Sequence, residues 1–378
     1  MGTTTVKRMN KNILLVEPGY RTYYPPLGLM KISRWHKEQK DIVNFIKVGV
    51  TPGEYFGGSN KRLKKHYDEI YITSLFTYHA AETVKAIQFF QNEYPQAQIK
   101  VGGVLATLLP NIIKEQTGIM PTVGLLDGPG GAEESAPDYS LFPNLKCSIT
   151  FTSRGCKRRC EFCAVSKHEP EYTVKENWEK DVHPKKNVII FWDNNWLQSP
   201  NFFKDVEKLK KLDRRFDFNQ GLDCRLFDEE KAKALADTKI KPLRFAFDNC
   251  AEDGHIQKAI KLARKTGFND IRVYVLFNSE YEEDTPEYFY DRINEMNRRG
   301  VLTYPMRYRP INSTNGNYIS PRWDKKLLRA VKLITLFYYS GGLIRKNREA
   351  FKEIFGRDRR AFKNKMYKVF EYDKRLKR

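Results

Sequence analysis

The second half of the chain repeats one pattern, a short apolar run followed by an amphipathic helical stretch, and no other sequence feature limits the fold as much. The expected strands are 148–152, 187–192, 216–219, 243–247, 271–277 and 302–307. Helical stretches lie between them, for instance 201–212, 229–236 and 254–266. Strands that alternate with crossover helices pair in parallel. The pattern therefore predicts a partial (β/α)6 barrel over 146–311, with its chemistry at the carboxyl ends of the strands.

The first 120 residues alternate in a similar way. We expect strands at 12–17, 41–48, 69–74 and 99–101, and helices at 27–40 and 80–93. This order predicts a doubly wound, Rossmann-like domain over 10–123. A stretch at 124–145 contains Gly, Pro, Asp and Ser with little periodicity and is predicted to be a linker. The fold class is therefore α/β, completed by a basic helical C-terminal extension at 312–378.

Three of the six cysteines stand together directly after the first expected barrel strand. The chain there reads Ser153-Arg154-Gly155-Cys156-Lys157-Arg158-Arg159-Cys160-Glu161-Phe162-Cys163. The spacing C-x3-C-x2-C places three soft thiolate ligands on one loop, which suits an iron–sulfur cluster. Three ligands leave one iron with an open position, as a catalytic centre needs. We therefore predict that Cys156, Cys160 and Cys163 bind a [4Fe–4S] cluster.

A structural zinc site is the alternative use of the same cysteines. His168 follows Cys163 by five residues and would complete a Cys3His tetrahedron. The six strand-like runs that follow favour the iron–sulfur interpretation, because a small zinc module does not require a barrel around it.

The cysteine motif, and its place after the first barrel strand, resemble the radical S-adenosylmethionine (SAM) superfamily over about 147–310. The resemblance implies that the open iron binds the amino and carboxylate groups of SAM. It also implies that an electron, from a donor such as flavodoxin or ferredoxin, cleaves SAM to methionine and a 5′-deoxyadenosyl radical. Abstraction of a hydrogen atom from an unactivated C–H bond of the substrate is the expected next step.

The resemblance also places cofactor contacts at the strand ends and beside the last cysteine. The positions that match are Phe162, Asp193, Asn194, Gln220, Arg225 and Asp248. Trp192-Asp193-Asn194-Asn195 replaces the Gly-Gly-Glu that the superfamily often carries, which weakens the match there. Asp and Asn at a strand end are also common turn residues. Cys224 and Cys250 follow strands and are candidate catalytic thiols, although a lone cysteine is often a small buried apolar residue.

The N-terminal half resembles the cobalamin-binding domain of one large radical SAM class. Pro25-Pro26-Leu27-Gly28 and the segment 101–107 match recurring phrases of that domain. The Asp-x-His-x-x-Gly motif that supplies a lower cobalt ligand is missing from 10–123. Cobalamin is therefore a candidate cofactor that the missing motif argues against, and a cobalamin-dependent methyltransferase is an alternative function. Another interpretation is that this domain is degenerate and serves to dock the substrate.

The net charge of +21 indicates an anionic partner or a strongly solvated surface. From Arg345 to Arg378 there are fourteen Lys and Arg against five Asp and Glu, a net charge of +9. We expect the extension to bury its aromatic residues on the barrel and to present a basic face to nucleic acid. The leading hypothesis is a transferase or isomerase that modifies nucleic acid or nucleotides. A peptide or small metabolite is not excluded, and a non-enzymatic cluster- or zinc-containing nucleic-acid-binding protein remains the alternative.

The sequence gives no sign of a membrane segment. No apolar run approaches the roughly 20 residues that span a bilayer, and residues 1–12 lack the apolar stretch of a secretory signal. The clustered cysteines fit an intracellular metal site better than a secreted disulfide framework. We therefore expect a cytoplasmic protein with no membrane partner.

Overall fold

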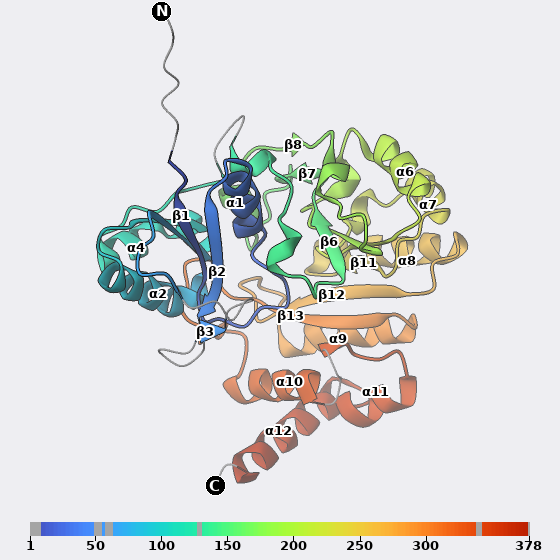
Figure 1. Cartoon of the computed structure of the whole chain (residues 1–378). Coiled ribbons are helices and arrows are strands. Elements are labelled where there is room, and N and C mark those ends of the chain that lie inside the picture. Colours follow the sequence, from blue (N-terminus) through green and yellow to red (C-terminus); the bar gives the residue numbers. More distant parts are fainter. Residues whose placement is uncertain (1–8, 49–54, 57–62, 127–130, 338–341, 377–378) are drawn as a thin grey trace, which may run out of the picture.

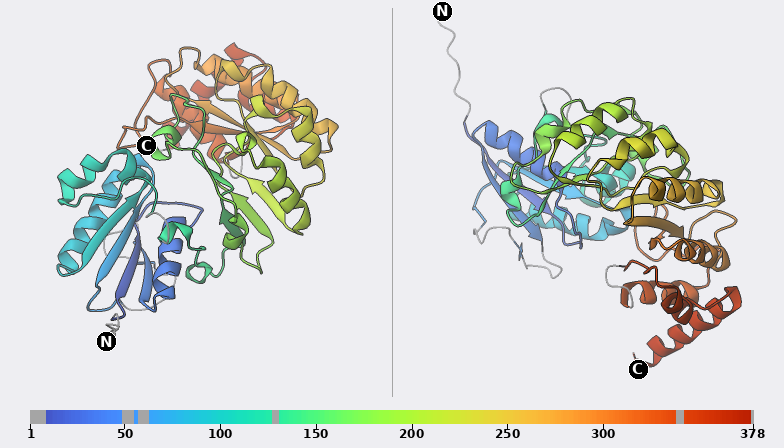
Figure 2. Two further views of the ribbon diagram at one scale, coloured as in Figure 1. Left: turned by 90° about the horizontal axis from the view of Figure 1, so that it is seen from above. Right: turned by 90° about the vertical axis from the view of Figure 1, so that its right-hand side faces the viewer.

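The computed structural model describes residues 9–48, 55–56, 63–126, 131–337 and 342–376. The start of the chain, 1–8, on which part of the localisation prediction depends, lies outside the described residues. The fold is α/β and contains two mainly parallel sheets that lie side by side (Figure 2, left). In that view the N-terminal sheet is blue, and the second sheet runs from green to orange.

The N-terminal sheet has the strand order β3-β2-β1-β4-β5 and is parallel except for β3. Its strands are β1 Asn12–Glu17, β2 Ile42–Val48, β3 Tyr55–Phe56, β4 Glu69–Ser74 and β5 Gln98–Gly103. Its helices are α1 Leu27–Glu38, α2 Ala80–Glu93, α3 Val104–Leu108 and α4 Pro110–Thr117. The order reverses at β1, which is the doubly wound arrangement that the sequence predicts.

The second sheet contains six strands that follow one another in chain order (Figure 1). They are β6 Cys147–Thr150, β9 Val188–Phe191, β10 Arg215–Phe218, β11 Leu243–Ala246, β12 Ile271–Phe277 and β13 Leu302–Arg307. Parallel bridges from Phe216 to Ile240 and from Leu222 to Phe245 join the β10 side to the β11 side. The predicted partial barrel is therefore confirmed, and β12 and β13 have the predicted bounds.

The crossover helices of the barrel are α6 Phe202–Lys211, α7 Glu229–Ala236, α8 His255–Lys265 and α9 Pro286–Arg298. They pack their apolar faces on the strands, and one hydrophobic cluster runs from Trp178 to Met366. A second cluster fills the N-terminal domain around Leu14, Ile70 and Phe90. Each sheet thus has its own core, and a third cluster, which includes Met30 of α1 and Ile149 of β6, joins the two sheets.

The C-terminal extension forms three helices, α10 Lys325–Phe337, α11 Arg348–Phe355 and α12 Arg359–Leu376, below α9 in Figure 1. Its aromatic residues pack as expected, because Phe351, Phe355 and Phe362 are buried and belong to the barrel core.

The stretch predicted to be a linker packs closely on the N-terminal domain where it is described. Its short turn Ala132–Glu134 contacts α1, and Asp138 accepts a hydrogen bond from the Ser33 hydroxyl at 2.6 Å. The proposed domain boundaries stay predictions. None of the described helices is long and apolar enough to cross a membrane.

Candidate functional site

A small hairpin closes the base of the loop that carries the three cysteines. β7 Ser153–Arg154 pairs antiparallel with β8 Thr173–Val174, so residues 155–172 form a loop above β6. Gly155 begins this loop with φ +75°, and a Cβ there would lie 2.2 Å from the backbone oxygen of Glu171. Its N–H donates to the Glu169 carboxylate at 2.8 Å. Glycine is therefore required at the first turn of the loop for both conformation and space.

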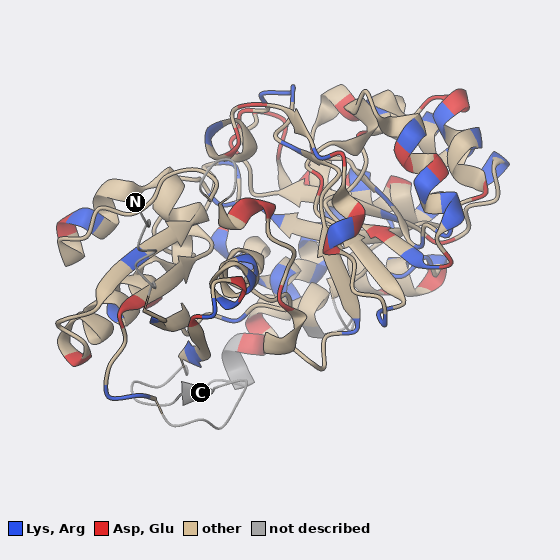
Figure 3. Cartoon of the chain, turned by 45° about the horizontal axis from the view of Figure 1, so that its top comes forward, with Lys and Arg blue, Asp and Glu red and all other residues tan. Residues whose placement is uncertain are grey.

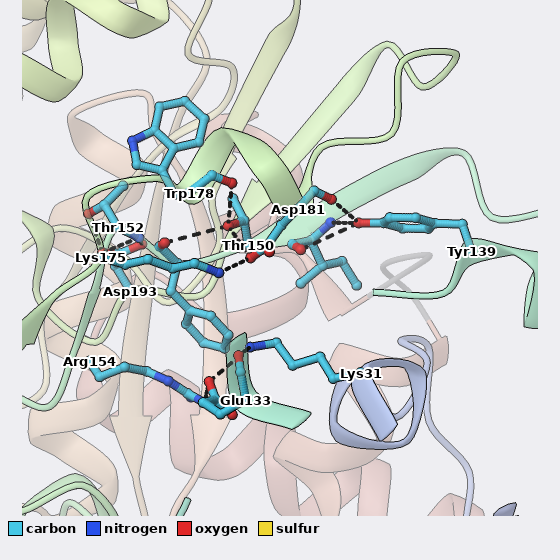
Figure 4. Close-up of polar contacts among 12 residues, drawn as sticks. Lys31, Glu133, Tyr139, Thr150, Thr152, Arg154, Lys175, Trp178, Asp181 and Asp193 are labelled. Atoms are coloured by element: carbon cyan, nitrogen blue, oxygen red, sulfur yellow. Dashed lines mark hydrogen bonds and ion pairs between the residues drawn. The ribbon is translucent and has the colours of Figure 1, made fainter. Parts of the chain in front are cut away.

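Arg154 joins this loop to the N-terminal domain through a chain of ion pairs (Figure 4). It pairs with Glu169 at 2.8 Å and with Glu133 at 2.8 Å, and Glu133 pairs in turn with Lys31 of α1 at 2.9 Å. Lys31 is only 1% exposed. Burial alone would raise the pKa of Glu133, but Arg154 and Lys31 bring that pKa below its usual value. The two domains are thus coupled electrostatically at the cysteine loop.

Asp193 and Asn194, two predicted SAM contacts, support the same loop. The Asp193 carboxylate is buried and accepts bonds of 2.6–3.2 Å from the backbone N–H and the hydroxyl of both Thr152 and Ser153. The Asn194 amide donates to Glu169 at 2.8 Å. Asp193 therefore holds the backbone just before the cysteines. Asn194 holds the carboxylate of Glu169, which closes the loop.

The three thiols of the loop lie close enough to influence one another. Burial, together with the nearby Cys160 and Cys156, raises the pKa of Cys163 to about 11. Burial and Cys156 also raise the pKa of Cys160, whereas Arg225 opposes this effect. Thiolates at these positions require a positive partner, which the irons of a cluster supply. The donor set therefore fits a cluster with three cysteine ligands.

The same loop does not form the tetrahedral zinc alternative. Within the described ranges, no three His, Cys, Asp or Glu side chains converge closely enough to hold one metal ion. His168 instead lies 4.0 Å from the Glu169 carboxylate. A cubane tolerates wider spacing of its cysteine sulfurs, because each sulfur binds a different iron.

A polar network beside Cys156 includes residues that sequence reasoning missed. Asn195 donates to the Cys156 sulfur at 3.7 Å and to Asp223 at 3.2 Å. Asp223 also accepts bonds from Arg158 and, at 2.7 Å, from Arg225. An Asp-x-Arg sequence at a strand end was the available signal for the Asp223–Arg225 pair. The predicted residue Arg225 is thus held beside the cysteine loop by a carboxylate.

The end of β11 places two acidic residues, Asp248 and Glu252, on this face of the barrel. Burial and the neighbouring carboxylate of Glu252 raise the pKa of Asp248 to about 7. Glu252 accepts from the backbone N–H groups of Asp248 and Asn249, and it lies 3.5 Å from Arg225. Glu252 therefore connects the two predicted residues, through an ion pair with Arg225 and a backbone hydrogen bond from Asp248.

The remaining predicted residues have different environments. The Phe162 ring packs edge-on against Tyr281, with centroids 6.0 Å apart. Gln220 is exposed just beyond β10. Cys224 is buried in the barrel core, and burial raises its pKa to about 12. Cys250 is exposed, and its backbone N–H donates to Glu283 at 3.4 Å. The two candidate catalytic thiols are therefore not equivalent.

Comparison with known proteins finds matches only in three dimensions. No known protein-family profile matches the sequence, and no curated protein matches it either. The radical SAM methyltransferase TsrM from Kitasatospora setae, solved with cobalamin and a [4Fe–4S] cluster, matches with a TM-score of 0.59 at 13% identity, over 80% of this chain and 77% of TsrM. The cobalamin-dependent radical SAM enzyme OxsB matches with a TM-score of 0.50 at 15% identity, over 82% of this chain and 54% of OxsB. Over about four fifths of its length the chain therefore shares its fold with these radical SAM enzymes.

Proposed function

We propose that this protein is a radical SAM enzyme, with Cys156, Cys160 and Cys163 as the ligands of a [4Fe–4S] cluster. The observation that carries the proposal is the place of the cysteine loop. It follows β6, the first strand of a six-stranded barrel, in a fold shared with TsrM. The carboxyl ends of parallel barrel strands are where catalytic groups gather.

When bound, the cluster supplies an electron whose transfer to SAM yields methionine and a 5′-deoxyadenosyl radical. The residues of the chain prepare the site for this chemistry. Glu169 and Gly155 fix the start of the loop, and Asp193 fixes the end of β6. The barrel shields reactive groups from water. We therefore reassign Asp193 from a SAM contact to a support of the loop.

For SAM itself, we propose Arg225 and Asp248 as polar contacts and Phe162 as an apolar one. Arg225 carries a guanidinium that can hold a carboxylate through two parallel bonds. Asp248 is half-buried beside Glu252, so its carboxyl group can donate or accept a hydrogen bond near neutral pH. Asn194 and Gln220 remain candidates at the rim. We assign no radical chemistry to the core residue Cys224, whereas the exposed Cys250 stays a candidate.

The proposed substrate is a nucleic acid or nucleotide, and the proposed location is the cytoplasm, with flavodoxin or ferredoxin as electron donor. Support for the substrate comes from the charge distribution. Lys and Arg are interspersed with Asp and Glu on the outer helices of the barrel (Figure 3). The C-terminal extension from Arg345, in contrast, has a net charge of +9. Positive charge of this kind tracks phosphates.

An anaerobic assay tests the proposed activity. The protein is reconstituted with iron and sulfide, reduced with dithionite and given SAM together with single-stranded RNA and DNA. We expect 5′-deoxyadenosine and methionine as products. A protein that binds zinc in this loop and nucleic acid, but never cleaves SAM, would support the binding-protein alternative.

A cobalamin-dependent methyltransferase is the second candidate, and a local observation favours it. Gly28 and Gly102 each have open space where a side chain would stand, and neither has a positive φ. Neither packing nor backbone conformation therefore explains why glycine stands at these two positions. Glycine does leave room for a ligand to approach the backbone closely. Gly103 is different, because a Cβ there would lie 2.1 Å from the Ser74 oxygen.

Cobalamin retention by the full-length protein tests this second candidate. We expect the wild type to retain hydroxocobalamin through gel filtration, as measured by its visible absorbance. Gly102→Leu is expected to reduce retention, and Glu115→Leu, at an exposed position of α4 in the same domain, is the matched control. Equal retention by Gly102→Leu and wild type, or none by either, would argue against this function.

A further inference from the structure

Two arginines lie close together at the end of the last barrel strand. Arg307 ends β13, and Arg309 follows two residues later. Arg309 is close enough to Arg307 for its charge to act on the Arg307 guanidinium. Arg307 donates to the backbone oxygen of Tyr318 at 2.6 Å, and the Arg309 guanidinium lies 4.2 Å from the ring centre of Tyr78. Both side chains are thus fixed in place at the carboxyl end of the barrel.

Neither guanidinium has an acidic partner among the residues that the structure describes. The Nε atoms of Arg307 and Arg309 are both buried and lack any hydrogen-bond acceptor. Other arginines near the candidate site do have carboxylates, for example Arg154 and Arg225. Both residues are half-buried. A cation that is partly withdrawn from water without a carboxylate partner is costly, and a bound anion would offset that cost.

Further positive charges gather around the same two arginines. Partial burial and the charge of Arg309 lower the pKa of Arg307. Lys332 of α10 also has a lowered pKa, caused first by partial burial and then by Arg307, Arg309 and Arg329. The four cations therefore lie within electrostatic range of one another. Their mutual repulsion would be relieved by a bound oxyanion with more than one negative charge.

Aromatic rings from the N-terminal domain adjoin these cations. The loop after β4 carries Phe76, Tyr78 and His79, and the rings of Phe76 and Tyr78 are stacked 5.1 Å apart with an interplanar angle of 10°. His79 stacks on Tyr20, which follows β1, at 5.2 Å. Phe76 is 46% exposed. An exposed ring beside clustered cations is the combination that binds nucleotides by stacking and by charge.

The N-terminal domain connects this cluster to the cysteine loop. Tyr78 contacts Arg309 at the β13 edge of the barrel, and α3 of the same domain contacts α5 Val165–His168, which follows the cysteines. Both contacts involve segments at the carboxyl edge of the N-terminal sheet, directly after β4 and β5. A substrate held at the arginines thus lies at the same end of the barrel as the proposed chemistry.

We propose that Arg307 and Arg309 bind a phosphate group of a nucleotide unit in the substrate, with Phe76 stacking on its base. Lys332 contributes charge at the edge of the same site. The inference rests on the proposed radical SAM function, which it deepens by naming the residues that select a phosphorylated, base-containing substrate. Planar guanidinium groups suit this role, because their N–H groups match the geometry of phosphate oxygens.

Binding of a labelled oligonucleotide to the reconstituted full-length protein tests the proposal. The probe is a fluorescein-labelled single-stranded RNA, followed by anisotropy over a range of salt concentrations. We expect Arg307→Gln and Arg309→Gln each to weaken binding roughly tenfold, and to reduce the salt slope by about 0.7, the contribution of one phosphate contact on a single strand. Lys258→Gln, an equal loss of charge on the exposed face of α8, is expected to bind as wild type.

Three further measurements separate the possible outcomes. Arg309→Lys preserves the charge without the planar fork and is expected to fall between wild type and Arg309→Gln. Phe76→Ala should weaken RNA binding but leave the affinity for inorganic pyrophosphate unchanged. Thermal melting confirms that each variant is folded. Wild-type affinity in both folded glutamine variants would overturn the proposal, as would a failure of wild type to bind RNA.

The two hypotheses fail in different ways. Slow SAM cleavage by the wild type in the absence of RNA tests the enzyme function by itself, whereas RNA binding by the arginine variants tests the phosphate site. SAM cleavage without any RNA binding would overturn the phosphate site alone. RNA binding through the arginines without SAM cleavage would overturn the proposed enzyme function alone.

Discussion

The carboxylate of Glu169 accepts a hydrogen bond of 2.8 Å from the backbone N–H of Gly155. This bond joins the two ends of the loop that carries Cys156, Cys160 and Cys163. The same carboxylate pairs with Arg154 and accepts a bond from Asn194. One buried acid thus sets the shape of the proposed cluster loop and connects it to β7 and to the end of β9.

Glu169→Gln is expected to loosen the cysteine loop. The change removes the charge that holds Arg154 and weakens the bond from Gly155, with an expected loss of about 2 kcal/mol in local stability, since hydrogen bonds to charged groups contribute that much. Iron per chain after reconstitution and desalting measures the effect, and we expect it to fall. Glu171→Gln is the matched control in the same loop, because the Glu171 side chain is exposed. Equal iron in both variants would contradict this role.

Gly155→Ala is expected to prevent the loop from forming. Alanine at φ +75° costs roughly 1–2 kcal/mol, and its Cβ would also clash with the backbone oxygen of Glu171. Gly118→Ala is the control, since Gly118 has nearly the same φ, +74°, but open space around a Cβ. Thermal unfolding should show that Gly118→Ala loses only the conformational cost in stability, whereas Gly155→Ala loses more. Gly155→Ala should also retain little iron after reconstitution. Similar behaviour of the two variants would show that the clash has no consequence.

The buried ion chain from α1 to the cysteine loop should be stronger than a surface pair. Lys31→Met leaves the Glu133 carboxylate with one cation fewer, and breaking a buried pair typically costs about 3–5 kcal/mol. Adding Glu133→Gln should cost less than it does in the wild type, because its bond to Lys31 is already lost and Arg154 keeps its pair with Glu169. Denaturant unfolding of the single and double variants measures the coupling. Lys204→Met, in an exposed pair with Glu176, should cost less than about 1 kcal/mol.

Asp205 should make the stability of the barrel depend on pH. Burial raises its pKa from 3.8 to about 6, although the Trp178 indole donates to it at 3.0 Å. The folded state therefore holds a proton that the unfolded state releases, so stability falls as pH rises from about 4 to about 6. Asp205→Asn is the reference, because it preserves an acceptor for Trp178. Relative to this variant, the free energy of unfolding of the wild type should fall by on the order of 3 kcal/mol across this pH range. Parallel unfolding profiles of the two proteins would contradict the shift.

The regular elements could be predicted because their signals are local. The apolar run Ile271–Phe277 and the amphipathic helix Glu229–Ala236 have the predicted bounds. The cysteine loop was equally visible, since its three ligands lie within eight residues. The hairpin of β7 and β8 was missed because two-residue strands have no periodicity. Its position depends on pairing across the cysteine loop.

The environment of the site residues could not be predicted in the same way. Asp193 ends β9 like many turn residues, and only the facing N–H groups of Thr152 and Ser153 show what its carboxylate does. Lys31 and Arg154 lie far apart in sequence, and the segment between their domains brings Glu133 to both. Cys224 and Cys250 follow similar strands but differ completely in exposure. Tertiary packing, which spacing does not encode, decides these cases.

The most direct test of the central proposal compares the three loop cysteines with the other three. Cys156→Ala, Cys160→Ala and Cys163→Ala are made separately, beside Cys147→Ala, Cys224→Ala and Cys250→Ala. Each reconstituted protein is reduced and incubated with SAM, and 5′-deoxyadenosine is measured together with bound iron. We predict that each loop variant loses SAM cleavage and bound iron. Cys147→Ala and Cys224→Ala, if folded, should retain SAM cleavage and bound iron. SAM cleavage that survives in the loop variants, or its absence from an iron-replete wild type tested with RNA, DNA and nucleotides, would contradict the account.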